Sequence, residues 1–119
     1  MRGRMSEKPL AWAGSSRKDL TDDNIFSLEA RKVAGKQLRK VQRGDEPDDW
    51  KPFDEVGAGT KEIRIKLPDG AFRVMYVAKF PEAVYILHCF KKKTQKTSSQ
   101  DTDLAKQRYK AIIQERSQS

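Results

Sequence analysis

The sequence has one cysteine, Cys89, and one histidine, His88, among its 119 residues. A single cysteine cannot form an internal disulfide, so we expect a reducing compartment and a cytoplasmic protein. One histidine and one cysteine also fall short of the usual zinc ligand sets, and no acidic cluster has the spacing of a calcium loop. We therefore expect no metal site and no cofactor.

Long apolar runs are also lacking. No segment approaches the roughly 20 apolar residues that a membrane-spanning helix needs, so we expect no membrane partner. The basic start at residues 1–6 has no apolar stretch behind it, and we do not expect it to be a secretory signal.

Positive charge, in contrast, is plentiful. The chain has 25 Lys and Arg against 17 Asp and Glu, a net charge of +8. Residues 91–119 hold eight basic and three acidic side chains, whereas residues 1–60 hold 12 and 11. An excess at one end suggests a surface that faces a polyanion. A merely solubilising surface is the alternative.

The length fits one domain over residues 1–119, with a frayed start at residues 1–7. Residues 9–13 predict an edge strand, and Ser15-Ser16 a short helical turn through Leu20. A helix is expected from Ile25 to about Arg43, capped by Asp22-Asp23-Asn24. Residues 44–60 predict a loop, pinned to the core by Trp50 and Phe53 and flexible at residues 57–59.

The hydrophobic period then changes to two. Ile63, Ile65 and Leu67 alternate with Glu62, Arg64 and Lys66, which is typical of a half-buried strand. A turn at residues 68–70 leads to strands at 71–79 and 83–90, and then to a final helix capped by Asp101. The pattern predicts an α+β domain with helices on one face of a twisted antiparallel sheet. The other face would stay open and carry the charged set.

Three cations are expected on that open face. Arg64 and Lys66 are two residues apart and share a face. If Leu67 pairs with Ala71 or Phe72, Arg73 falls near Lys66, although a slip of one residue would reverse its side. Such a group persists more readily if an anion binds there. Ordinary surface charge, with Glu62 as a partner, is the alternative.

The segment after the third strand is rich in lysine. Lysine is a compact charge suited to phosphate, and threonine hydroxyls can donate to phosphate oxygens. A solvated loop is the alternative reading. His88 is either a general acid or base or a satisfied strand histidine. Cys89 should point to the opposite face, which disfavours a Cys–His nucleophile pair.

Chemistry that relies on cations and hydroxyls favours RNA cleavage, because RNA supplies its own nucleophile, the 2′-OH. Arginines would hold the charge that develops on the phosphate. A lysine crowded by cations, such as Lys66, would have a lowered pKa and could accept a proton. Lys92 or Lys93 would protonate the leaving oxygen or stabilise its charge.

Several segments together resemble the phage-derived, HigB-like branch of the RelE toxin superfamily, over about residues 8–113. They are Lys8–Ser16, Trp50–Pro52, Glu62–Arg64, Phe72–Tyr76 and Leu87–Thr97. The resemblance implies a RelE-type fold and a toxin that enters the ribosomal A site and cleaves messenger RNA. It also implies a small helix-turn-helix antitoxin of the HigA type.

The resemblance assigns roles by position. Arg64 and Lys66 match the basic strand pair, and Arg73 matches the arginine that grips the scissile phosphate. Lys92 and Lys93 match a further catalytic cation. RNA contacts are expected from the neighbouring Lys91, Thr94 and Lys96, and from His88.

One position departs from the family pattern. RelE has a tyrosine soon after the last cation, whereas the next tyrosine here is Tyr109, inside the final helix. The general base therefore stays open between Lys66 and His88. Two other functions compete with cleavage: a non-catalytic nucleic-acid binder that uses the same face, and a protein that docks an acidic partner there.

Overall fold

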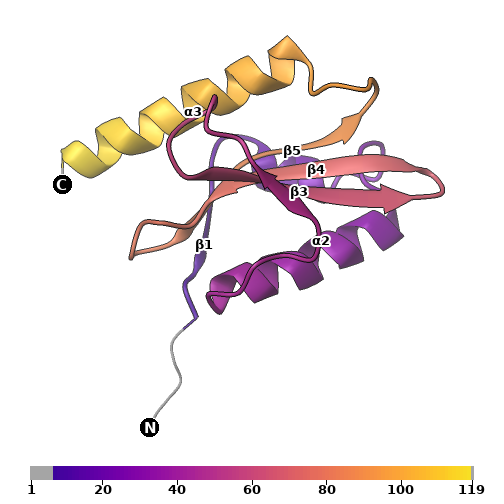
Figure 1. Ribbon diagram of the computed structural model, residues 1–119, viewed down its shortest axis with the longest axis horizontal. Helices are drawn as coiled ribbons and strands as arrows, with labels where there is room; N and C mark the ends of the chain where they lie inside the picture. The colour runs from indigo at the N-terminus through magenta and orange to yellow at the C-terminus, as the bar shows by residue number, and fades with distance from the viewer. Residues whose placement is uncertain (1–6, 119) are drawn as a thin grey trace, which may run out of the picture.

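The computed structural model describes residues 7–118, and within them five strands form one sheet in the order β1–β5–β4–β3–β2 (Figure 1). The elements along the chain are β1 (Leu10–Trp12), α1 (Ser16–Leu20), α2 (Leu28–Gln42), β2 (Trp50–Pro52), β3 (Thr60–Leu67), β4 (Gly70–Val77), β5 (Val84–Lys92) and α3 (Ser99–Ser117). The predicted α+β class is confirmed, and the arrangement is compatible with a RelE-type fold. The sheet is mixed rather than purely antiparallel, because the edge strand β1 runs parallel to β5.

The predicted meander is formed by β3, β4 and β5. Leu67 pairs with Gly70, so the turn between β3 and β4 is only two residues long. Gly70 has φ +148°, a conformation that glycine adopts without strain. The predicted pairing of Leu67 with Ala71 or Phe72 was therefore wrong, because a tighter turn closes the hairpin.

The expected loop at residues 44–60 contains a further edge strand, β2, which pairs antiparallel with β3. Trp50 opens this strand, and the ammonium of Lys61 lies 4.5 Å from the centre of its ring. Glycines follow β2, and this part contacts α3. The Tyr109 side chain of α3 lies against Gly57, and its hydroxyl donates a hydrogen bond of 2.7 Å to the Ala58 carbonyl.

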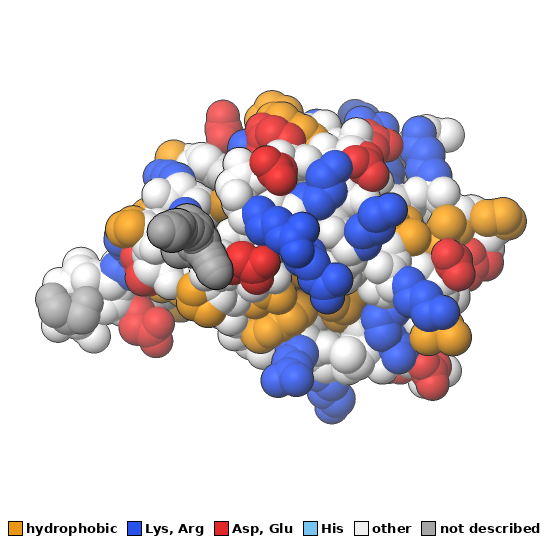
Figure 2. Space-filling model, turned by 90° about the horizontal axis from the view of Figure 1, so that it is seen from below, with side chains coloured by type: hydrophobic (Ala, Val, Ile, Leu, Met, Phe, Trp, Pro, Cys, Tyr) orange, Lys and Arg blue, Asp and Glu red, His pale blue; other side chains and the backbone are white. Residues whose placement is uncertain are grey.

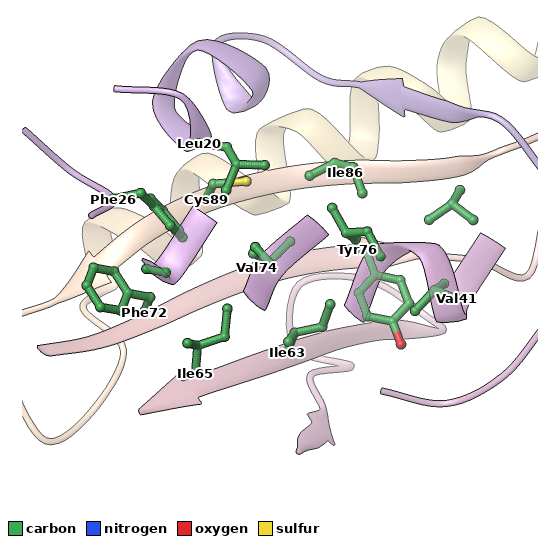
Figure 3. Packing of buried hydrophobic residues seen from close by; sticks show 14 residues of the cluster. Leu20, Phe26, Val41, Ile63, Ile65, Phe72, Val74, Tyr76, Ile86 and Cys89 are labelled. Atoms are coloured by element: carbon green, nitrogen blue, oxygen red, sulfur yellow. The ribbon is translucent and has the colours of Figure 1, made fainter. Parts of the chain in front are cut away.

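Helix α2 covers one face of the sheet. Figure 3 shows Phe26 and Val41 packed against Phe72, Val74 and Tyr76. The helix begins at Leu28, later than predicted, because the Ser27 hydroxyl accepts a hydrogen bond of 3.2 Å from the Ala30 amide. Ser27 is thus the N-cap in place of the expected residues 22–24.

Helix α3 lies on the other face, so the expectation of a wholly open face was wrong (Figure 1). Ala105 and Ile112 of α3 belong to one buried apolar cluster with Met75, Val77 and Leu87 of the sheet. These apolar strand residues need cover, and α3 provides it. The β3–β4 hairpin extends past the N-terminal end of α3, so α3 leaves this face of the sheet uncovered at the hairpin (Figure 1).

The start of α3 is fixed by Ser98, not by Asp101 as predicted. The Ser98 hydroxyl accepts from the Asp101 amide at 3.1 Å and donates to the Asp101 carboxylate at 2.7 Å. Both bonds use the Ser98 hydroxyl, which makes Ser98 the N-cap of α3, while Asp101 holds that hydroxyl in place from the first turn.

The N-terminal residues were expected to be frayed. Residues 1–6 of that prediction lie outside the described part of the chain. Glu7 forms an ion pair with Arg43, with 3.1 Å between Glu7 Oε2 and Arg43 Nε. Among the helices in residues 7–118, none has the length and apolar character required to cross a membrane.

Candidate functional site

Two arginines lie directly opposite each other on neighbouring strands. Arg64 of β3 pairs with Arg73 of β4, and Lys66 pairs with Ala71 closer to the turn. Directly paired residues share a sheet face, and so do residues two apart on one strand. Arg64, Lys66 and Arg73 are therefore on the same face, with Arg64 rather than Lys66 as the direct partner of Arg73.

Burial separates these three cations. Lys66 is exposed near the end of the hairpin and Arg64 is half-buried. Arg73 is only 3% exposed, so the expectation of three bare cations was wrong at this residue. It faces Glu62 on the neighbouring strand, whose Oε1 lies 3.7 Å from Arg73 Nε and which is itself 0% exposed.

Glu62 is the centre of a small buried network. Lys51 Nζ of β2 lies 3.8 Å from Glu62 Oε1, and the Thr97 hydroxyl donates to Glu62 Oε2 at 3.1 Å. Among the described residues, Glu62 Oε1 and Arg73 Nε have no hydrogen-bond partner, although both atoms are buried. The carboxylate is thus held mainly by charge, with one hydroxyl donor.

Lys92 joins this group because β5 has a bulge. Met75 pairs with His88 but Tyr76 pairs with Ile86, so Leu87 is extra. Beyond the bulge, Phe90 lies opposite Arg73 and Lys92 lies opposite Ala71. The bulge thereby turns Lys92 to the side of Arg73 and leaves Lys91 on the other side, with its ammonium 5.6 Å from the centre of the Phe72 ring.

We call Lys51, Arg64, Arg73 and Lys92 the cation cluster. The pKa of Lys92 is lowered below its usual 10.5, chiefly by desolvation and next by the charge of Arg73. Lys51 and Arg64 lower it further, while Glu62 opposes them. Burial likewise lowers the pKa of the Arg73 guanidinium, and Glu62 raises it. The four cations of the cluster face the buried carboxylate of Glu62 and the half-exposed carboxylate of Asp49, which lies 4.0 Å from Arg64 Nε, so positive charge remains in excess.

The rest of the lysine-rich run forms an exposed turn. Lys93, Thr94 and Lys96 are all exposed, and the Thr94 hydroxyl donates to the Lys96 carbonyl at 2.6 Å. Lys92 donates to the Gln95 carbonyl and so ties the turn back to the end of β5. These side chains are accessible to a ligand, which fits both a phosphate-binding segment and a solvated loop.

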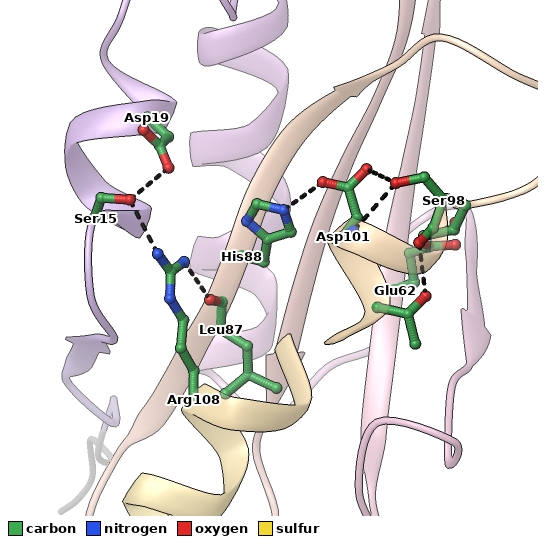
Figure 4. A network of polar contacts seen from close by, with 10 residues as sticks. Ser15, Asp19, Glu62, Leu87, His88, Ser98, Asp101 and Arg108 are labelled. Carbon is green, nitrogen blue, oxygen red and sulfur yellow. Dashed lines mark hydrogen bonds and ion pairs between the residues drawn. The ribbon is translucent and has the colours of Figure 1, made fainter. Parts of the chain in front are cut away.

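His88 is buried beneath the start of α3, where its Nε2 has a partner but its Nδ1 has no hydrogen-bond partner among the described residues. Figure 4 shows its Nε2 directed at Asp101, 2.7 Å from Oδ1. The ring stacks on Phe90 with 4.7 Å between centroids. Burial lowers the pKa of His88, although Asp101 opposes this shift. At 5% exposure His88 joins β5 to α3, and a direct contact with RNA is not supported.

Cys89 points the other way, as predicted, into the apolar cluster beneath α2. Arg108 extends the polar network of Figure 4 on the α3 side: it donates to the Leu87 carbonyl at 2.9 Å and to the Ser15 hydroxyl at 3.0 Å. These contacts hold α3 in place and do not reach the cation cluster.

A second basic surface lies on the opposite side of the molecule. Figure 2 shows Lys and Arg side chains gathered over α2. Its exposed members are Lys32, Lys36, Arg39 and Arg43. Neighbouring cations on this side are paired, Arg31 with Asp23 at 2.6 Å and Lys40 with Asp48 at 2.5 Å. Positive charge is therefore not confined to the cation cluster.

The sequence carried no signal for Lys51, and it indicated Glu62 only as a partner for surface charge, not as a buried residue. Lys51 lay in a predicted loop, and only its place on β2, opposite Glu62, brings it to the cluster. Within residues 7–118, no group of three or more His, Cys, Asp or Glu side chains is arranged to hold a metal ion. The functional groups at this site are cations, hydroxyls and the carboxylates of Glu62 and Asp49.

A family model described as phage derived protein Gp49-like (DUF891) matches residues 24–110, which include β2 to β5 and most of α3. A search of curated proteins found no match.

Proposed function

The chain belongs to the phage-derived Gp49-like family, part of the RelE/ParE-like toxin superfamily, and on this premise we propose that it is a metal-independent RNA-cleaving toxin. The proposed substrate is messenger RNA in the ribosomal A site. The observation that carries the proposal is the direct pairing of Arg64 with Arg73, with Lys92 on the same face.

The proposed reaction uses the substrate's own nucleophile. The 2′-oxygen attacks the adjacent phosphorus and loses its proton, and the bond from phosphorus to the 5′-oxygen breaks. The 5′-oxygen takes up a proton, so the products are a 2′,3′-cyclic phosphate and a free 5′-hydroxyl. The enzyme must stabilise extra negative charge on the phosphate and move two protons.

The accessible cations suit these tasks. Arg64 is half-buried on the exposed end of the face, and its guanidinium can hold two phosphate oxygens at once. Lys92 has a lowered pKa, so it gives up a proton more readily than an ordinary lysine. It can therefore donate a proton to the leaving 5′-oxygen. Lys66 is exposed two residues from Arg64 and is the candidate base, because His88 is buried.

Arg73 serves this reaction from beneath the surface. Its guanidinium faces the Glu62 carboxylate, which offsets its charge, so its part is to hold Glu62 in place below the exposed cations. Lys93, Thr94 and Lys96 lie exposed just beyond Lys92 and can bind the flanking backbone of the RNA.

The test is induction of the chain in a bacterium, with growth and messenger 5′ ends followed together. We expect arrested growth and new 5′ ends with the unchanged chain, and relief of both with Lys92→Ala and with Arg64→Ala. Lys110→Ala, an exposed change on α3, is the matched control and should behave as the unchanged chain. Normal growth and unchanged messenger ends with the unchanged chain would contradict the proposal.

A second candidate is a non-catalytic nucleic-acid binder that uses the same cations. The burial of Arg73 against Glu62 favours it, because a guanidinium already facing a carboxylate is less available to a phosphate. This candidate predicts RNA binding by the purified chain with no new messenger ends.

A toxin of this kind needs a neutralising partner. We propose a small helix-turn-helix antitoxin of the HigA type, encoded next to this chain. Co-expression of the neighbouring reading frame should restore growth, and failure to restore it would remove that frame as the partner.

A further inference from the structure

A groove adjoins the cation cluster, between β2, the turn after β5 and the first turns of α3. Its volume is about 480 Å³. The residues that give it its character are Lys51, Phe53, Lys96, Thr97, Thr102 and Asp103. The cleavage chemistry proposed above uses the cations beside the groove but leaves the groove itself without a role.

The groove and the cation cluster are joined through one carboxylate, that of Glu62. Lys51 lines the groove and lies 3.8 Å from Glu62 Oε1, the atom that faces Arg73. Thr97 also lines the groove and donates to the other oxygen of Glu62. A chain of RNA whose phosphate lies on the cluster would therefore have a neighbouring nucleotide within reach of the groove.

We propose that this groove binds the base of a single-stranded RNA nucleotide adjacent to the phosphate held by the cation cluster, a proposal that rests on the function proposed above. The volume lies within the roughly 300–1,000 Å³ of small-molecule sites. Phe53 is half-buried: it packs against the apolar cluster beneath α3 and also lines the groove. Aromatic rings of this kind are the usual platforms for unpaired bases.

The charges at the groove are divided in a way that suits one nucleotide. Lys51 Nζ lies 5.3 Å from the centre of the Phe53 ring, so a cation and an aromatic surface occur together. Lys96 adds a second cation, and both suit the phosphate. The acidic side chains suit the base, because a carboxylate accepts hydrogen bonds from ring N–H and amino groups.

Asp103 gives the groove a preference among bases. Glu55 also lines the groove but lies 3.8 Å from Lys106 Nζ, which neutralises it. The Asp103 carboxylate can accept both the ring N–H and the amino group of guanine, whereas uracil carries no amino group. The groove therefore selects guanine over uracil.

The experiment measures binding rather than cleavage. The probes are fluorescently labelled oligonucleotides of four nucleotides, rich in guanine or in uracil. They carry 2′-deoxyribose throughout, so they cannot be cut through a 2′-OH. Fluorescence anisotropy gives the affinity for the purified chain at several salt concentrations. Because binding does not require cleavage, the result stands apart from the growth test.

The expected results distinguish the groove from the cation cluster. Phe53→Leu should weaken binding about tenfold without changing the salt dependence, and Phe53→Tyr should preserve binding because stacking is retained. Arg64→Ala should instead reduce the salt slope by roughly 0.7, as expected for one lost phosphate contact on a single strand. Asp103→Asn should remove the preference for guanine, and Lys110→Ala should change nothing.

The inference is overturned if Phe53→Leu binds as tightly as the unchanged chain while Arg64→Ala binds weakly. It is also overturned if the unchanged chain does not distinguish guanine from uracil, or binds neither oligonucleotide. If guanine-selective binding through Phe53 is found but growth and messenger ends are unaffected in cells, the groove stands and the cleavage proposal fails. Thermal unfolding of Phe53→Leu guards against a folding defect. If that variant unfolds, Asp103→Asn at an exposed position decides, because an unchanged preference for guanine in it would overturn the inference.

Discussion

Glu62 Oε1 lies 3.7 Å from Arg73 Nε, and the two side chains are 1% and 4% exposed. They come from neighbouring strands, β3 and β4, and form an ion pair inside the same sheet face. A buried charge that loses its partner is costly, whereas the intact pair adds little net stability. Arg73 is therefore needed for folding as well as for any role toward a phosphate, and substitutions at this position have two effects.

We expect Arg73→Ala to lower the free energy of unfolding by about 3 kcal/mol, because Glu62 is left buried without its main counter-charge. The double variant Arg73→Met, Glu62→Leu should recover most of this loss. Urea unfolding, followed by circular dichroism, measures both. Arg64→Ala is the matched control at a half-buried site and should cost under about 1 kcal/mol. An Arg73→Ala variant as stable as the unchanged chain would show that Glu62 is held by other groups.

His88 should make stability fall on acidification. Its pKa in the folded chain is below the usual 6.5, mainly because it is buried, while Asp101 opposes the shift and Arg108 adds to it. The unfolded chain therefore takes up a proton near pH 6.5 before the folded chain does, and the free energy of unfolding falls from there downward. Replacing His88 with Gln removes this titration and leaves an amide that can donate to Asp101.

The measurement is urea unfolding of the unchanged chain and His88→Gln at pH 7.5 and 5.5. The stability advantage of the unchanged chain over the variant should shrink at the lower pH. An advantage of equal size at both pH values would contradict a lowered pKa for His88.

Gly57 should not tolerate a side chain. An added Cβ would come within 2.5 Å of the Tyr109 ring, which is flat and cannot yield as a flexible chain end can. We expect Gly57→Ala to cost about 1–3 kcal/mol through overpacking and loss of the hydrogen bond from Tyr109 to Ala58. The unfolding midpoint in urea checks this.

Gly35 is the matched control for that change, since the space around an added Cβ on α2 is open within 4 Å. Gly35→Ala should leave stability unchanged or raise it, because alanine favours a helix more than glycine does. Equal effects at the two glycines would refute the packing of Tyr109 on Gly57.

The lowered pKa of Lys92 predicts the pH dependence of cleavage. If Lys92 supplies the proton to the 5′-oxygen, the rate should fall with rising pH through a value below the usual 10.5. Lys92→Arg keeps the positive charge at all these pH values, so the alkaline fall should disappear and leave a slower, flatter profile. Rates of purified chain on ribosome-bound messenger, corrected for spontaneous hydrolysis, measure this. An identical profile in Lys92→Arg would remove Lys92 from proton transfer.

Much of the architecture was predictable because it follows from local patterns. The alternation around Ile63 and Ile65 fixed which residues of β3 face α2, and so which ones share a face with Arg64. The opposite orientation of His88 and Cys89 followed in the same way. These features need only the two-residue period of a strand.

The site was less predictable because it depends on strand register and on which distant residues bury its side chains. Simple alternation from Ile86 would place Lys92 on the α2 side, and only the extra residue at Leu87 turns it toward Arg73. The burial of Glu62 depends on Lys51 in a three-residue strand and on Thr97 after β5, both distant in sequence. Hydrophobic patterns carry no signal for such contacts.

Attack by the 2′-OH is tested with a messenger that carries a single 2′-deoxy nucleotide. The site cut by the purified chain on ribosomes is first mapped, and the nucleotide whose 2′-OH would attack is then replaced by its deoxy form. Our account predicts that cutting stops at that site alone, and that fragments from the unmodified messenger carry a 5′-hydroxyl. Cutting of the deoxy site at an undiminished rate, or fragments with a 5′-phosphate, would contradict it.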